Sequence, residues 1–216
     1  MQLIVSACRT LANRLRLRLL RVIHDKPGQP VHVLAAAVKQ PPDAVSHQLK
    51  LLCDYQFARA APSGRRVFYH PVASGATSHP FLRGLRELLD EALLAAWKIR
   101  TPDKVCEFET GRWDDSLLKL FTTYTHLRRL LILRLLDSHG AVTIASVSEQ
   151  IGMSPDAAYR HLDKLRRRGV VASSGTHPVY WSVVPVTGAA LRQRLLACVL
   201  RELQRSQTAV GKFAHL

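Results

Sequence analysis

The chain has 216 residues, of which 47% are hydrophobic, and 31 Lys and Arg against 16 Asp and Glu give it a formal charge of +15. This length allows two domains of about 100 residues each, and the charge favours a polyanionic partner over an acidic small substrate. No apolar run is long enough for a membrane span, and the N-terminus does not resemble a signal peptide, so we expect a cytoplasmic protein. The four cysteines are scattered and are expected to be reduced thiols: Cys8, Cys53, Cys106 and Cys198.

Residues 3–23 are predicted to form one long helix. Its apolar stripe consists of Leu11, Leu15, Leu19 and Val22, which recur at helical spacing, and Leu17, Leu20 and Ile23 widen it. Four arginines are interleaved with this stripe and either are solvated or also touch a phosphate backbone: Arg14, Arg16, Arg18 and Arg21. The Pro- and Gly-containing segment 26–30 is expected to end the helix.

A helix-turn-helix is predicted next. Residues 33–38 form a short helix, Gln40 and Pro41 the turn, and Pro42–Leu52 a second helix. The second helix has an apolar side, made of Val45, Leu49 and Leu52, and a polar side that is expected to face bases or nearby phosphates, made of Ser46, His47 and Lys50.

A wing is predicted to follow this helix. Residues 57–61 and 67–72 are expected to be strands, and the turn between them carries Arg65 and Arg66. The two arginines suit contacts with DNA phosphates, although an ordinary solvated hairpin is the alternative. Phe81–Ile99 is then predicted to be a helix that serves in packing, because its local charge is nearly neutral.

The same order of elements is predicted again after a boundary at residues 101–113. A long helix over 117–136, a short helix over 144–151 and a turn at Gly152 lead to Ser154, a residue type that caps helices. In the helix that starts at Pro155, Ala158, Leu162 and Leu165 are expected to face the core, and Tyr159 and Arg160 to face DNA. Asp156 and Asp163 share the polar side with them.

The end of the chain completes this second copy. The helix runs into Arg166, Arg167 and Arg168, which either hold phosphates or form a solvated helix end. Residues 170–172 and 179–184 are predicted strands, with His177 in the connecting loop. A last helix is expected over 187–205, with fraying after it.

The sequence thus predicts a mainly α fold with small β-hairpin wings (α+β). It consists of two tandem winged helix-turn-helix domains, at residues 1–105 and 106–216. Five elements in the same order and at similar spacing make a chance match improbable.

The chain resembles the ArsR-type winged-helix repressors of bacteria. Residues 44–52 are similar to their recognition helix, residues 11–16 to the start of their first helix, and residues 64–69 to their wing. Residues 154–162 repeat the pattern less closely. The resemblance implies a DNA-binding repressor and, because such proteins dimerise, a pseudo-dimer within one chain. The metal-binding residues of that family do not match: residues 33–38 hold no cysteine, and His79 is followed by Glu87, Asp90 and Glu91 without a second His.

We therefore expect a sequence-specific regulator that binds double-stranded DNA through ten residues: Ser46, His47, Lys50, Arg65, Arg66, Tyr159, Arg160, Arg166, Arg167 and His177. No metal, cofactor or enzymatic activity is expected, because glycine-rich phosphate loops, paired carboxylates and metal-ligand spacings do not occur. The alternative is a protein-interaction or dimerisation scaffold in which at most one copy binds DNA. Phe81–Ile99 or the last helix offers a surface for a further homodimer.

Overall fold

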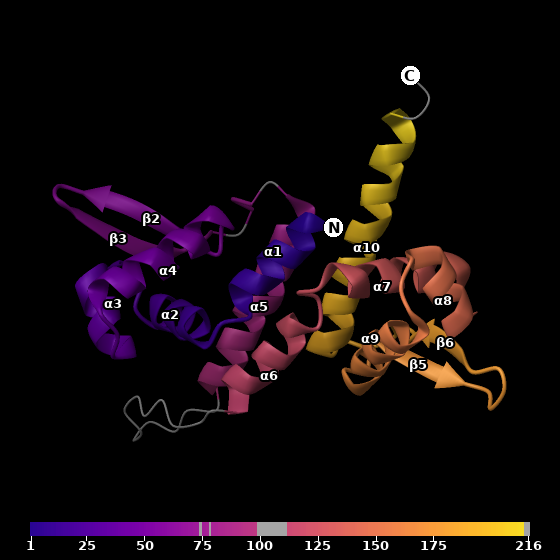
Figure 1. Ribbon diagram of the computed structural model, residues 1–216. Coiled ribbons are helices and arrows are strands. Elements are labelled where there is room, and N and C mark those ends of the chain that lie inside the picture. The colour runs from indigo at the N-terminus through magenta and orange to yellow at the C-terminus, as the bar shows by residue number, and fades with distance from the viewer. Residues whose placement is uncertain (74, 78, 99–111, 214–216) are drawn as a thin grey trace. The chain divides into compact units, whose positions relative to one another are not determined.

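The computed structural model describes residues 1–73, 75–77, 79–98 and 112–213 (Figure 1). Its contacts divide the chain into two compact units. The N-terminal unit consists of Ala7–Leu118, and the C-terminal unit of Met1–Ser6 together with Lys119–Leu216. The predicted boundary at 101–113 falls mostly on residues 99–111, which lie outside the described residues, as does Cys106.

The N-terminal unit contains helices and one small sheet. After α1 (Gln2–Leu11), its elements are α2 (Arg14–Asp25), β1 (Gln29–Pro30), α3 (Val31–Val38), α4 (Pro42–Asp54), β2 (Ala58–Ser63), β3 (Arg66–Pro71), α5 (Pro80–Lys98) and α6 (Arg112–Thr122). The antiparallel sheet has the order β1-β3-β2, with Ser63 opposite Arg66 at the hairpin end. The sequence analysis missed β1, because a strand of two residues shows no alternation of polar and apolar side chains.

The C-terminal unit has the same order of elements around its sheet. Its elements are α7 (Leu127–His139), β4 (Val142–Thr143), α8 (Ile144–Ile151), α9 (Pro155–Arg167), β5 (Val171–Ser174), β6 (Tyr180–Val183) and α10 (Leu191–Phe213). The sheet order β4-β6-β5 corresponds to that of the first sheet. The last helix is longer than predicted, since α10 continues to Phe213 instead of fraying after 205.

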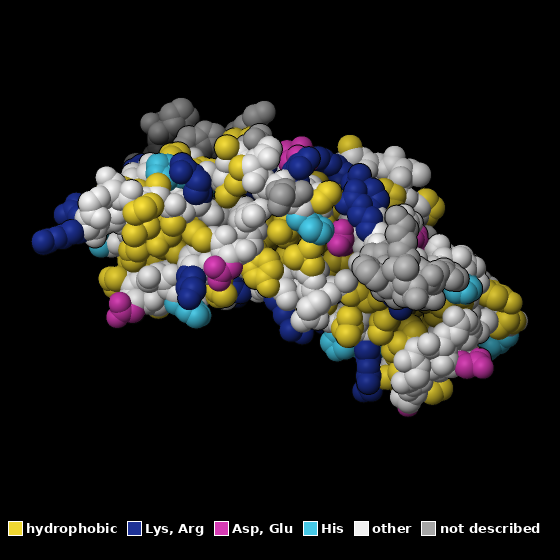
Figure 2. Space-filling model, turned by 90° about the horizontal axis from the view of Figure 1, so that it is seen from above, with side chains coloured by type: hydrophobic (Ala, Val, Ile, Leu, Met, Phe, Trp, Pro, Cys, Tyr) yellow, Lys and Arg dark blue, Asp and Glu magenta, His cyan; other side chains and the backbone are white. Residues whose placement is uncertain are grey.

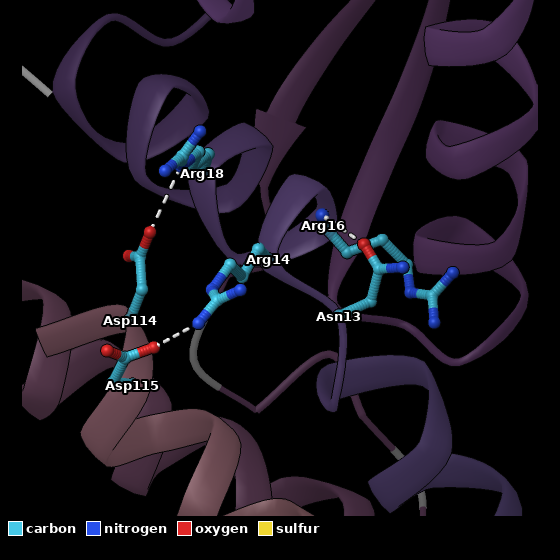
Figure 3. Close-up of polar contacts among 6 residues, drawn as sticks. All are labelled: Asn13, Arg14, Arg16, Arg18, Asp114 and Asp115. Carbon is cyan, nitrogen blue, oxygen red and sulfur yellow. Dashed lines mark hydrogen bonds and ion pairs between the residues drawn. The ribbon is translucent and has the colours of Figure 1, made fainter. Parts of the chain in front are cut away.

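The two long helices predicted at 3–23 and 117–136 are wrong, because each is two helices. The first is interrupted at Ala12 and Asn13, where the Asn13 side chain accepts a hydrogen bond from the Arg16 N–H at 3.1 Å (Figure 3). The second is interrupted between Thr122 and Leu127, where His126 Nδ1 accepts a hydrogen bond from the Arg128 N–H. Apolar periodicity continued across both breaks and concealed them.

Ion pairs connect α2 to α6 within the N-terminal unit. The Arg18 Nε lies 3.0 Å from Oδ2 of Asp114, which is buried, and Arg14 pairs with Asp115 at the surface (Figure 3). A further hydrogen bond joins the Arg16 guanidinium to the Thr10 carbonyl. Arg18 therefore holds α2 against α6 through a buried carboxylate, so the predicted solvated or phosphate-binding role does not describe it, whereas the Arg14 side chain is 61% exposed and is solvated as well as paired.

Both cores are built from apolar residues of the predicted helices, although Leu15 and Val22 of the predicted stripe are only half-buried. Leu17, Leu19, Leu20 and Ile23 are fully buried in α2, and Leu130, Ile132 and Leu133 in α7. None of the helices among the described residues is long and apolar enough to cross a membrane.

Candidate nucleic-acid interface

Helix α9 has the two-sided character that the sequence predicts. Ser154 caps it by accepting a hydrogen bond from the Ala157 N–H at 3.3 Å, and Pro155 occupies its first turn. Ala158, Leu162 and Leu165 are fully buried, so the helix is fixed to the core by one side. Tyr159 and Arg160 are exposed on the other side. The arrangement presents polar side chains from a helix that packing holds rigid.

Helix α4 has the same character in the N-terminal unit. Val45, Leu49 and Leu52 are fully buried, whereas Ser46, His47 and Lys50 are exposed. Beside this exposed side, Gln48 accepts a hydrogen bond at 2.5 Å from the guanidinium of Arg16, which joins α2 to α4.

The turns before the two helices are alike in backbone but not in residue type. Lys39 ends α3 in the left-handed conformation with φ of 55°, and Gly152 ends α8 in the same region with φ of 68°. A lysine is strained in this conformation and glycine is not. Both turns direct the chain from a short helix, α3 or α8, into the helix with the exposed polar side, α4 or α9.

The β2–β3 hairpin carries exposed cations at its far end. Gly64 and Arg65 form the turn, Arg66 begins β3, and both arginines are exposed. Lys and Arg side chains gather at this end of the hairpin, at the left of Figure 2. The predicted strands at 57–61 and 67–72 are therefore each shifted slightly, and the turn is tighter than the predicted segment 62–66.

The corresponding hairpin of the C-terminal unit is aromatic instead of basic. His177 is exposed in the loop between β5 and β6. The exposed fraction of Tyr180 is 41%, that of Tyr159 is 49%, and the Tyr159 ring meets the buried Trp181 edge-on at a centroid distance of 6.4 Å. The strands predicted at 170–172 and 179–184 are found at Val171–Ser174 and Tyr180–Val183.

Arg166 and Arg167 are exposed as predicted, but both are paired with Asp163. Asp163 Oδ1 lies 2.8 Å from Arg166 Nη2, and Oδ2 lies 2.7 Å from Arg167 Nε. The hydrogen bond from Arg166 is the main cause of the lowered pKa of Asp163. Both arginines thus share one carboxylate, which reduces the positive charge that they offer to a phosphate.

A group of cationic and histidine side chains beside α9 was missed by the sequence analysis. The rings of His126, at the start of α7, and His161, on α9, have centroids 4.7 Å apart. Arg129 is buried, and its guanidinium donates to the carbonyl oxygens of Thr122 and Thr123, each at 2.8 Å. The sequence does not place these residues close together, because His126 and His161 meet only through the packing of α7 on α9.

No group of three or more potential metal ligands occurs in the described residues. Two of the residues considered above as possible metal ligands have other contacts here. His79 Nδ1 accepts a hydrogen bond from the Phe81 N–H at 3.2 Å. Asp90 Oδ1 lies 3.3 Å from His24 Nε2, and Asp90 Oδ2 lies 3.8 Å from Arg86 Nε. Burial raises the pKa of Asp90 to about 6.

Comparison with known proteins identifies one segment. Residues 126–172 match the family model described as winged helix-turn-helix DNA-binding. No curated protein matches the chain. A crystal structure of ScpB from Mycobacterium tuberculosis is similar at 20% sequence identity over 80% of this chain and 91% of that chain, with a TM-score of 0.25. The matched segment begins at the cap of α7 and ends within β5, so residues 126–172 contain a winged helix-turn-helix domain of the DNA-binding class.

Proposed function

We propose that the protein is a cytoplasmic, sequence-specific transcriptional regulator of the ArsR type, acting as a repressor, that binds double-stranded DNA. The observation that carries this proposal is α9. Within the segment matched to DNA-binding winged helices, it holds Tyr159 and Arg160 exposed over a fully buried side. A helix of this kind fits the major groove, where base edges differ, and an arginine can donate two hydrogen bonds to guanine.

The proposal includes the N-terminal unit as a second, non-identical winged helix. Its element order, its sheet order and the exposed side of α4 support this interpretation. The exposed Arg65 and Arg66 suit phosphate contacts, which position a protein on DNA without specifying sequence. Two such units in one chain would form a pseudo-dimer.

The test is DNA binding by a variant in α9. Duplexes are selected from a random pool by the full chain, and affinity is then measured by fluorescence anisotropy. Arg160→Ala should weaken binding by about 5- to 150-fold, because a specific arginine–base contact is worth roughly 1–3 kcal/mol.

Arg205→Ala is the charge-matched control, because Arg205 is an exposed arginine of α10 in the same unit. Equal losses for the two variants would show that Arg160 contributes only general charge. Failure of the pool to yield any bound duplex would overturn the proposed function.

The second candidate is a protein-interaction scaffold in which at most one unit binds DNA. The exposed Tyr159 and Tyr180 favour it, because tyrosine is enriched in protein interfaces. The pairing of Arg166 and Arg167 with Asp163 also leaves α9 less basic than its sequence suggests. A shallow dependence of DNA affinity on salt, with an intact fold, would support this candidate.

A further inference from the structure

The cluster between α7 and α9 is cationic and is formed by residues outside the predicted interface, apart from Arg160. His126 and Arg128 come from the start of α7, and Arg160 and His161 from α9. His126, Arg128 and Arg160 are exposed, and His161 is half-buried. The cluster is therefore accessible from the surface that adjoins the exposed side of α9.

The charges around His161 are all of one sign. Burial, followed by the charges of His126, Arg129, Arg128 and Arg160, lowers the pKa of His161. Helices α7 and α8 and strand β5 pack against α9. Of these, α8 contributes Glu149, which is exposed and is not among the charges acting on His161, and β5 has no ionisable side chain. Helix α7 also contributes Asp137, which accepts a hydrogen bond from Gln204, and in the described residues no carboxylate is among the charges that act on the pKa of His161.

The hydrogen bond of His126 fixes which of its nitrogens can donate. Nδ1 accepts from the Arg128 N–H at 3.2 Å, so the proton of the neutral ring is on Nε2. Arg129, which lies beneath the cluster, is held by the Thr122 and Thr123 carbonyls. The positive end of the α7 dipole adds to the field. These are the features of an anion site built from several donors on two packed helices.

We propose that His126, Arg128 and His161 form a proton-dependent site for a backbone phosphate of DNA beside helix α9. This inference rests on the proposed DNA binding and extends it to the flank of the recognition helix. Arg128 supplies permanent charge, His126 supplies a ring N–H, and the nearby Arg160 remains available for its base contact. Protonation of His161 completes the site by adding a further positive charge and donor.

The direction of the pH dependence follows from the charges. In the free protein, burial and the neighbouring cations keep His161 neutral near pH 7. A bound phosphate offsets those cations and raises the pKa of His161, so binding takes up a proton. Affinity therefore rises as pH falls between the higher pKa of the complex and the lower pKa of the free protein, by at most about tenfold per pH unit for one proton.

The experiment measures binding to a short mixed-sequence duplex, because a phosphate contact does not depend on base sequence. Affinity is determined at several salt concentrations and between pH 5.5 and 8 for the full chain. His161→Gln should remove most of the increase at low pH, and Arg128→Ala should reduce the salt slope by about 1. His139→Gln is the control, because His139 is an exposed histidine at the opposite end of α7.

Nuclear magnetic resonance of the His161 ring in the native chain measures the pKa directly, so this test does not depend on whether His161→Gln folds. The His161 pKa should rise when the duplex is added to the native chain, and Arg128→Ala should raise it in the free protein. An unchanged His161 pKa on DNA binding, or an unchanged pH profile in a folded His161→Gln variant, overturns this inference and leaves the proposed function standing. Absence of binding to mixed-sequence and selected duplexes at every pH overturns both.

Discussion

Asp163 decides how much positive charge the end of helix α9 presents. Its carboxylate contacts two of the three consecutive arginines, Arg166 and Arg167. The sequence places Asp163 on the polar side of the helix, where its negative charge alone would oppose phosphate binding. The structure gives a different reason for the same effect, since the carboxylate pairs with cations that would otherwise be available to DNA.

Replacing Asp163 should therefore strengthen DNA binding. Asp163→Asn frees both arginines, so affinity should rise several-fold and the slope of log affinity against log salt should steepen by about 1 for each new phosphate contact. Fluorescence anisotropy across a salt series measures both quantities. Glu149→Gln is the control, because it removes one negative charge from an exposed residue of α8. An equal gain in DNA affinity in this control would show that only the net charge of the protein matters.

At the scale of elements, the turns that precede α4 and α9 have the same backbone conformation with different residues. Lys39 adopts a positive φ that L-residues avoid, whereas Gly152 occupies the equivalent place without strain. A side chain added at Gly152 would meet open space, so backbone strain alone decides its effect.

Substitutions at these two turns should have opposite effects on the free energy of unfolding. Lys39→Gly should raise it by up to about 1 kcal/mol, because relief of strain exceeds the entropy that glycine adds to the unfolded chain, and Gly152→Ala should lower it by about 1 kcal/mol. Thermal or urea denaturation followed by circular dichroism measures both. A loss in both variants would contradict the assignment of strain to Lys39.

The ion pairs between α2 and α6 differ in burial and should differ in their effect on stability. Asp114 is 3% exposed, and its Oδ1 has no hydrogen-bond partner in the structure as described, so it relies on Arg18. Arg18→Met should lower the free energy of unfolding by about 2 kcal/mol, because it leaves a buried carboxylate unpaired.

Arg14→Met is the matched control, since it removes a surface pair and should change stability little. Urea denaturation compares the two variants. If the double variant Arg18→Met with Asp114→Leu is no more stable than Arg18→Met alone, the unpaired carboxylate is not the cause of the loss.

Sequence reasoning identified the buried sides of α4 and α9 well, because each has three apolar residues at helical spacing and each was found fully buried. The Ser154 cap was confirmed for the same reason, since it depends on neighbours in sequence. The breaks at Asn13 and His126 were not predicted. The helical spacing of apolar residues continues across both positions, and neither N-cap side chain interrupts that pattern. The His126–His161 pair was beyond prediction, since tertiary packing alone creates it.

At the scale of the whole molecule, the net positive charge and the difference between the exposed sides of α4 and α9 predict properties of the DNA site that the proposed function requires. The exposed side of α4 offers Ser46, His47 and Lys50, whereas that of α9 offers Tyr159 and Arg160. Two different surfaces cannot both match identical half-sites. If both units bind DNA as proposed, the protein is expected to select an asymmetric sequence.

Selection from a random pool followed by sequencing tests this expectation, with footprinting of the bound duplex to locate each unit. The result expected is a site whose two halves differ, with affinity falling steeply as salt increases. A strict palindrome would instead indicate that two chains pair and present the same unit twice.

The contact between α2 and α6 has a practical consequence for dividing the chain. A fragment that ended at residue 105 would lack α6, and with it both carboxylates that pair with Arg14 and Arg18. Its counterpart would begin with α6 detached from the helix that covers Asp114, and would lack Met1–Ser6, in which Ile4 and Val5 are buried. The boundaries of the two compact units therefore differ from the boundaries of the two predicted repeats, because each unit includes residues from both repeats. Proteolytic or recombinant halves cut at the repeat boundary would therefore expose surface that the intact chain buries.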